Sequence, residues 1–354
     1  MSFPQTASLT ITNHCNLRCQ MCGQWSEEGY VRANADGLQH EMTLADWKRV
    51  VDELAAHHVA GVCVRGGEPF MFPGIVELLE YIQPKGMYVS IDTNGTMLSR
   101  YARDIVRIGG MHLTISVDGP EAIHDEVRGV PGTFGRLRDG IARLNAAKGE
   151  GGNSDQPISL SICFTISRYN YRYLGSMPDV ARSLGIESIA IVPYYYVPAS
   201  TGAAYERELG GLGCSNAFSW KGFHNEDSGV DPDEFVRQLR QYQESLGDVR
   251  SYPYMPLTED EYRAWFAAPQ TPVGPQYCLN VERQIDVQPD GSVNFCVDFI
   301  DYSFGSVRET GVEQLWNGER AERFRAYRRR QPLAVCYRCG AKYMSKPWTE
   351  YAPA

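Results

Sequence analysis

The part of the chain up to Pro193 alternates short aliphatic and β-branched runs with longer amphipathic stretches, and this alternation restricts the fold most. Gly, Asn or Pro follows most of the short runs, as is typical of strand ends. The expected strands are Ser8–Ile11, Gly61–Arg65, Met87–Asp92, Leu113–Val117, Ile158–Ile166 and Ser188–Val192. Six strand–helix repeats predict an α/β fold with a parallel sheet and right-handed crossovers. A partial (β/α)6 barrel, with its active site at the carboxyl ends of the strands, fits this count better than a closed eight-unit barrel.

Amphipathic stretches between the strands predict helices that cover the sheet. Thr43 and Asp46 form a capping pattern at the start of the first helix, which should end at Ala56. The other expected helices are Ile75–Ile82, Ser99–Ile108, Thr133–Lys148 and Arg172–Leu184.

Beyond Pro193 the alternation ends. Pro198–Gly229 is rich in Gly, Ser and Asn and is typical of a loop, whereas Asp233–Leu246 has the pattern of a helix. Ser251–Tyr277 contains five prolines and several aromatic residues, which favours a linker packed on the barrel. We therefore expect a barrel over residues 1–230, a helix and linker over 231–277, and a second module over 278–354.

Composition disfavours several classes of protein. Hydrophobic residues make up 43% of the 354 residues, which is enough for a buried core, and the net charge of -9 argues against a nucleic-acid binder. The sequence has no apolar run of the roughly 18 residues that a membrane helix needs, and no signal-peptide pattern. A cytoplasmic protein with no membrane partner is therefore expected. In a reducing compartment, its ten cysteines indicate metal ligands rather than disulfides.

Three cysteines follow the first expected strand closely. Cys15, Cys19 and Cys22 have the spacing C-x3-C-x2-C. Three thiolates on one loop can hold three irons of a [4Fe–4S] cube, which leaves the fourth iron open to a small molecule. A structural zinc site would need a fourth ligand, and His14 would have to fold back to supply it.

This triad, with Met21 before its last cysteine, resembles that of the radical S-adenosylmethionine (SAM) enzymes, and the resemblance covers nearly the whole chain. It implies a partial TIM-like barrel in which the open iron chelates the amino and carboxylate groups of SAM. It also implies cleavage of SAM to methionine and a 5′-deoxyadenosyl radical, which abstracts hydrogen from a substrate.

The resemblance also implies SAM contacts at the ends of the expected strands. Gly66-Gly67-Glu68-Pro69 matches the motif that binds the SAM amino group, although the same four residues are also a common turn. The expected SAM contacts are Met21, Gly66, Gly67, Glu68, Asn94, Ser116, Asp118, Thr165 and Val192. For Asn94 a plain turn, and for Val192 a core position, are the alternatives. His124, Asp125 and Arg128-Gly129 resemble a segment of this branch of the family, in which Arg128 should either pair with a carboxylate or form an ordinary surface ion pair.

Four cysteines form a second set near the carboxyl end: Cys278, Cys296, Cys336 and Cys339. Between the first two, Pro289-Asp290-Gly291 predicts a hairpin turn. The arrangement resembles the Twitch module, a shortened SPASM domain, because no cysteine follows Cys339. This implies one fully ligated auxiliary [4Fe–4S] cluster, suited to electron transfer or a structural role. A structural zinc ribbon fits the spacing as well.

The three remaining cysteines, a run of three tyrosines and a group of six arginines can each be interpreted as structural or functional residues. Cys63 and Cys163 lie in expected strands as small buried hydrophobes. Cys214 lies in a Gly- and Ser-rich loop, where it is either a bystander or a catalytic hydrogen-atom donor. Tyr194, Tyr195 and Tyr196 either line a pocket or pack beneath a loop. Six arginines between Arg320 and Arg330 indicate a solvated face, or a site for an acidic flavodoxin- or ferredoxin-type reductant.

The favoured reaction is oxidation of a small polar substrate, such as a sugar or aminocyclitol, with the auxiliary cluster taking the electron. One alternative is an epimerase that uses Cys214. Another is a maturase of a ribosomally made peptide. A non-catalytic iron–sulfur carrier would not need the Gly66–Pro69 and Asn94 motifs.

Overall fold

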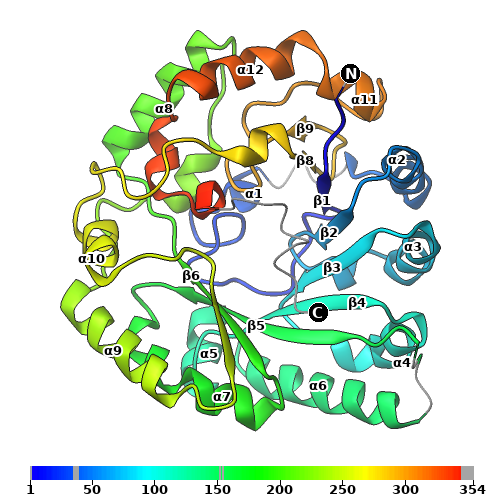
Figure 1. Ribbon diagram of the computed structural model, residues 1–354, viewed down its shortest axis with the longest axis vertical. Helices are drawn as coiled ribbons and strands as arrows, with labels where there is room; N and C mark the ends of the chain where they lie inside the picture. The colour runs from blue at the N-terminus through cyan, green and yellow to red at the C-terminus, as the bar shows by residue number, and fades with distance from the viewer. Residues whose placement is uncertain (1, 35–39, 151–152, 154, 344–354) are drawn as a thin grey trace.

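One curved sheet organises the chain in the computed structural model, which describes residues 2–34, 40–150, 153 and 155–343 (Figure 1). Its nine strands run in the order β7-β6-β5-β4-β3-β2-β1-β8-β9, and every neighbouring pair is parallel except β8 and β9. The strands are β1 (Thr6–Thr10), β2 (Gly61–Arg65), β3 (Tyr88–Thr93), β4 (Met111–Ser116), β5 (Ser159–Ile166), β6 (Ser188–Pro193), β7 (Arg250–Pro253), β8 (Gln284–Val287) and β9 (Val293–Asn294). All six expected strands are present, and the sheet forms a partial, open barrel.

Helices cover the outer side of this sheet, with α2, α3, α4 and α6 following one another along it (Figure 1). The longer helices are α2 (Leu44–Ala56), α3 (Ile75–Ile82), α4 (Leu98–Ile108), α5 (Glu121–Arg128), α6 (Thr133–Gly149), α7 (Met177–Leu184), α8 (Ala199–Gly211), α9 (Pro232–Ser245), α10 (Glu259–Ala267) and α12 (Glu319–Arg330). The short ones are α1 (Tyr30–Ala33) and α11 (Val312–Trp316). Thr43 caps α2 together with Asp46, as the sequence predicts. No helix among the described residues is long and apolar enough to cross a membrane.

Two segments contain more regular structure than expected. The segment 251–277, predicted to be a linker, contributes most of β7, which pairs with β6, and the whole of α10. Helix α10 begins at a capping box between Thr258 and Glu261, a sequence signal that the prolines around it obscure. The segment predicted as a Gly- and Ser-rich loop, 198–229, contains α8, whose Gly202 leaves room for the ring of Trp220.

The carboxyl-terminal hairpin extends the barrel sheet. Strand β8 pairs in parallel with β1, and Ser8 lies opposite Asp286 in that register. The predicted turn is confirmed: Gly291 has a φ of +87°, and β9 returns antiparallel to β8. The expected second module therefore continues the sheet at the β1 edge; its residues 344–354 lie outside the described part of the chain.

The two faces of the sheet differ in polarity because side chains alternate along each strand. The outward-facing side chains of Leu9, Val64 and Leu113 are fully buried against the helices. Those that alternate with them face the barrel interior and are mainly polar: Ser8, Cys63, Arg65, Ser90, Asp92, Thr114, Ser116, Cys163 and Thr165. Many of these inner side chains are only half-buried. The barrel interior is therefore a polar space rather than a packed core.

Candidate active site

The cysteine loop after β1 rests on the two glycines that follow β2. Thr12 O accepts a hydrogen bond of 2.8 Å from the N–H of Gly67, and His14 O accepts one of 2.8 Å from Glu68. A Cβ atom on Gly67 would lie 2.4 Å from His14 O, and one on Gly66 would lie 2.5 Å from Thr12 O. These glycines therefore permit the close approach of the backbone that leads into Cys15.

Replacing Gly67 by alanine is expected to destabilise the protein by about 1–3 kcal/mol, because the added methyl group overlaps a backbone carbonyl that cannot move freely. The measurement is the free energy of unfolding together with iron content, which should fall at the first cysteine set. Gly210→Ala is the matched control, since its Cβ meets nothing within 4 Å. Equal stability of the two variants would contradict this role of Gly67.

Glu68 joins the ends of β2 and β3. Its carboxylate is fully buried and accepts hydrogen bonds from the Thr93 hydroxyl at 2.8 Å, the Asn94 N–H at 2.8 Å and the Phe70 N–H at 3.1 Å. Burial raises the pKa of Glu68 to about 7, while these donors oppose the shift. In the structure the carboxylate thus holds two strand ends in register, and its contact with a SAM ammonium stays a prediction.

A ring of amide and hydroxyl groups connects the end of β3 to the cysteine loop. The Asn94 amide donates to Asn16 Oδ1 at 3.0 Å, the Asn16 amide donates to Thr96 Oγ1 at 2.9 Å, and the Thr96 hydroxyl donates to Asn94 Oδ1 at 2.6 Å. Sequence reasoning did not find Asn16. Its only signal is its position inside the C-x3-C spacing.

Each sulfur of the first cysteine set accepts one N–H group. The donors are the Leu17 N–H to Cys15 at 3.5 Å, the Trp25 N–H to Cys22 at 3.3 Å and Arg128 to Cys19 at 3.6 Å. Burial raises the pKa of Cys15 to about 12 and that of Cys19 to about 11. Buried or half-buried sulfurs that each take an N–H donor fit the thiolate ligands of an iron–sulfur cluster, whose charge such donors stabilise.

Arg128 is half of a buried ion pair. Its Nε lies 2.6 Å from Asp118 Oδ2, and the two side chains are 9% and 0% exposed. The alternative of a surface pair is therefore wrong. Asp118, expected to contact the cofactor, has Arg128 as its charged partner in this structure.

The four half-buried cysteines of the second set lie within electrostatic reach of one another. Burial and then the charges of Cys336, Cys339 and Cys278 raise the pKa of Cys296 well above its usual value. Arg328 is 2% exposed and lies within electrostatic reach of all four sulfurs. A buried cation beside four thiols fits the net negative charge of a cluster that four cysteines ligate.

Helix α12 is therefore not simply a solvated face. Arg325 and Arg328 point into the protein, and the guanidinium of Arg325 lies 4.1 Å from the ring centroid of Trp316. Among the described residues, no three His, Cys, Asp or Glu side chains converge tightly enough to hold one metal ion. A cube of four irons instead takes its thiolates at separate corners.

A group of charged side chains lies within electrostatic reach of both cysteine sets. Asp298 is close enough to Cys22 and to Cys339 for its carboxylate to raise the pKa of both thiols. Arg65 at the end of β2 lies within electrostatic reach of Asp298, Asp92 and Asp286, and it forms no direct ion pair within the described chain. Burial raises the pKa of Asp286 to about 7. We call Arg65, Asp92, Asp286 and Asp298 the inner chamber.

Cys63 and Cys163 face this interior as well. Both are half-buried, and the thiol of Cys63 lies 3.6 Å from Asp92 Oδ2. The expectation that they are small core residues is wrong, because their side of each strand faces the polar interior. Tyr195 also faces the chamber, whereas Tyr196 is buried and its hydroxyl donates to Trp265 O at 2.8 Å.

Family models match both parts of the chain that carry the cysteines. The model of the radical SAM superfamily matches residues 9–158, and that of the SPASM iron–sulfur cluster-binding domain matches residues 278–340. The chain belongs to the radical SAM superfamily. As a radical SAM enzyme with this second domain, it uses SAM and two [4Fe–4S] clusters as cofactors.

The relatives of this radical SAM enzyme have names that refer to different activities. It is 25% identical to the Fe-coproporphyrin III synthase of Methanosarcina barkeri, over 93% of this chain and 79% of that protein. It is 30% identical to the PqqA peptide cyclase of Rhodopseudomonas palustris, over 54% of this chain and 48% of that protein. Its fold is similar to that of Streptococcus suis SuiB, with a TM-score of 0.65 and 13% identity over 92% of this chain and 68% of SuiB.

The other expected SAM contacts of this radical SAM enzyme lie at one edge of its sheet. Thr165 of β5 and Val192 of β6 are opposite each other in register, and Ser116 is opposite Cys163. All three expected contacts are half-buried. Met21 is buried in an apolar group with Leu17, Cys19 and Val127, which packs behind the cysteine loop.

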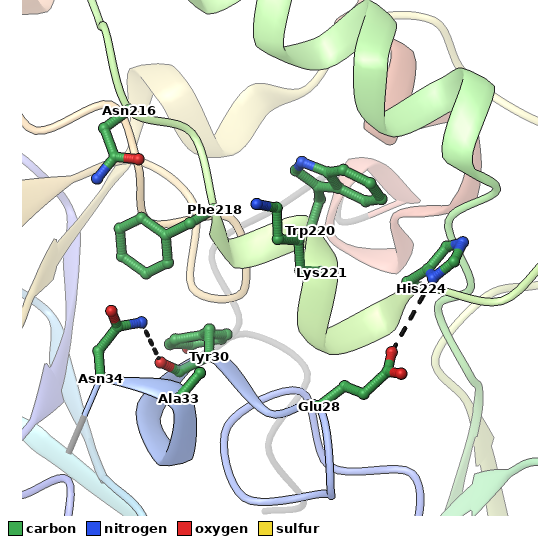
Figure 2. Close-up of a pocket in the computed structure, with 9 residues that line it drawn as sticks. All are labelled: Glu28, Tyr30, Ala33, Asn34, Asn216, Phe218, Trp220, Lys221 and His224. Carbon is green, nitrogen blue, oxygen red and sulfur yellow. Dashed lines mark hydrogen bonds and ion pairs between the residues drawn. The ribbon is translucent and has the colours of Figure 1, made fainter.

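An open groove of about 570 Å³ lies between residues 28–34, which follow the cysteine loop in sequence, and residues 216–224. Figure 2 shows Tyr30 and Asn34 on one side, and Phe218, Trp220 and Lys221 on the other. The rings of Tyr30 and Phe218 meet edge to face at 6.0 Å. Burial raises the pKa of the Tyr30 hydroxyl, and the charges of Asp298 and Cys22 add to that rise, so Tyr30 lies within electrostatic reach of both residues.

Cys214 lies just before the groove-lining segment 216–224 in sequence and is half-buried. Its thiol lies 3.3 Å from Asp301 O, and the Asp301 carboxylate accepts hydrogen bonds from Phe218 N and Ser219 N. These partners explain Cys214 as a packed loop residue. Its role as a hydrogen-atom donor stays a prediction.

Proposed function

We propose that this radical SAM enzyme oxidises an organic substrate held in the inner chamber, and that the auxiliary cluster accepts the electron. The observation that carries this proposal is the place of Asp298, within electrostatic reach of Cys22 on one side and Cys339 on the other. A substrate in the same space lies between both cofactors. The bound cofactor supplies a radical that removes one hydrogen atom from the substrate.

The residues of the chamber perform the remaining tasks. The first cluster is held by Cys15, Cys19 and Cys22, and the auxiliary one by Cys278, Cys296, Cys336 and Cys339. After loss of a hydrogen atom, oxidation requires the substrate to lose one proton and one electron. A carboxylate oxygen of Asp298 takes the proton; burial raises the pKa of this carboxyl group, and the charge of Arg65 opposes that rise.

We infer the substrate class from the polarity of the inner chamber, because none of the residues that define it is specific for a sugar. The names of the relatives refer to a tetrapyrrole and a peptide, so the sugar or aminocyclitol expected from the sequence is not retained. The chamber instead calls for a substrate with both hydrogen-bond acceptors for Arg65 and donors for Asp92 or Asp298. A flavodoxin- or ferredoxin-type reductant, for which α12 still exposes Arg320 and Arg323, remains part of the proposal.

Peptide maturation is the second candidate function. The groove lined by Tyr30, Phe218 and Trp220 is open to solvent, and one of these residues, Tyr30, lies within electrostatic reach of Asp298. A peptide can lie in such a groove while one of its residues enters the chamber. The relative named PqqA peptide cyclase supports this reading over about half of the chain.

An assay of 5′-deoxyadenosine separates these candidates. The reduced enzyme is incubated anaerobically with SAM and host extract that has been split by size. Stimulation by the small-molecule fraction supports metabolite oxidation, and stimulation only by the large fraction supports peptide maturation. If the reduced enzyme forms no 5′-deoxyadenosine under any condition, the proposed function is wrong.

A further inference from the structure

We infer that Arg128 and Asp118 together set the reduction potential of the SAM-binding cluster through Cys19. This inference rests on the proposed assignment of Cys19 as a cluster ligand. Arg128 would act as a positioning and tuning residue, because it reaches the cofactor only through the sulfur of Cys19.

Arg128 contacts both Cys19 and Asp118, so two charged side chains lie in series beside the ligand sulfur. The Arg128 guanidinium donates to Cys19 Sγ at 3.6 Å through one terminal nitrogen, and its Nε lies 2.6 Å from Asp118 Oδ2. Both residues are buried, so water screens neither charge. The Asp118 N–H donates to His124 Nδ1 at 3.2 Å. Burial lowers the pKa of His124 to about 2, and the imidazole therefore adds no charge of its own.

Backbone contacts hold Arg128 in this place. The end of α5 accepts hydrogen bonds from the cysteine loop, from Gln20 N to Val127 O at 2.9 Å and from Arg18 N to Arg128 O at 3.3 Å. Gly129 then turns the chain with a φ of +70°, and a Cβ atom there would lie 2.5 Å from Arg18 O. The backbone at Arg128 is therefore fixed relative to the cysteine loop, and the guanidinium approaches Cys19 from one direction.

Arg128 and Asp118 should have opposite effects on the reduction potential of the SAM-binding cluster. A cation that donates to a ligand sulfur stabilises the electron-rich, reduced cluster, so Arg128 raises the potential. Asp118 offsets part of that positive charge and holds the guanidinium in orientation. The first cluster must take an electron before SAM can be cleaved, which gives this balance a direct role in the enzyme.

The test measures the midpoint potential of the cluster whose electron paramagnetic resonance signal changes on addition of SAM, in the holoenzyme without substrate. Arg128→Met should lower the equilibrium constant for one-electron reduction by about tenfold, a shift of 59 mV to more negative potential. Asp118→Asn should shift it by a similar amount in the opposite direction. Arg128→Lys should recover part of the loss. Arg138→Met, which breaks an exposed pair with Glu121, is the control and should leave the potential unchanged.

A merely structural pair would behave differently. Shifts of the same sign in Arg128→Met and Asp118→Asn, or no shift in either, would overturn the inference. If Arg128→Met fails to retain iron, Asp118→Asn decides alone: a more positive potential supports the inference and any other value overturns it. Because no turnover is measured, failure of the wild-type enzyme to cleave SAM would count against the proposed function and leave this comparison intact.

Discussion

Replacing Cys15, Cys19 and Cys22 together by alanine is expected to abolish SAM cleavage and to leave about half of the bound iron. The reconstituted wild-type chain should hold about eight irons in two cubes of four, and the triple variant about four. The second cysteine set is built around Arg328 and other partners, so it should keep its cluster. Iron per chain and 5′-deoxyadenosine formation measure the two effects.

The reciprocal variant makes this prediction specific. Cys336→Ala with Cys339→Ala should also remove about half of the iron, but reduced protein should retain slow cleavage of SAM without substrate. Cys63→Ala is the control, because its thiol faces the interior from mid-strand and belongs to neither set. Loss of all iron, or of none, in the first triple variant would contradict the assignment of two separate sites.

The barrel could be predicted because Gly, Asn or Pro follows most of its strands and because helices separate them. All six expected strands lie within three residues of their observed bounds, and the Pro289-Asp290-Gly291 turn forms the expected hairpin. Strand β7 could not be found in the same way, since it is short and contains Pro253. Its stability comes from pairing with β6, a long-range contact that no local pattern encodes.

The two cysteine sets were visible in the sequence, whereas the groups around them were not. Spacing alone identifies Cys15, Cys19 and Cys22 as one set, because three nearby thiols on one loop have few other uses. Arg65 and Asp298 come from segments more than 200 residues apart. They come within electrostatic reach of each other only because β8 pairs with β1, which brings the chain after β9 close to the end of β2. The burial of Arg325 and Arg328 likewise depends on which side of α12 faces the auxiliary domain.

Arg65→Met is expected to reduce substrate-dependent turnover by about 10- to 100-fold, the effect of losing a charge-assisted hydrogen bond of about 1.5–3 kcal/mol. The readout is kcat/KM for 5′-deoxyadenosine formation with the extract fraction that stimulates the wild-type enzyme. Cleavage of SAM without substrate should be unchanged, since Arg65 belongs to the inner chamber and to neither cysteine set.

Stability distinguishes substrate binding from a structural role of Arg65. Arg65 is half-buried and forms no direct ion pair within the described chain, so its removal should leave the free energy of unfolding unchanged or raise it. Arg103→Met, at a side chain that is 89% exposed, is the matched control and should affect neither quantity. A variant at Arg65 that loses stability and both activities in parallel would show that the residue supports the fold. Loss of substrate-dependent turnover at full stability would place the substrate's acceptor group beside Arg65, because no other measured quantity would have changed.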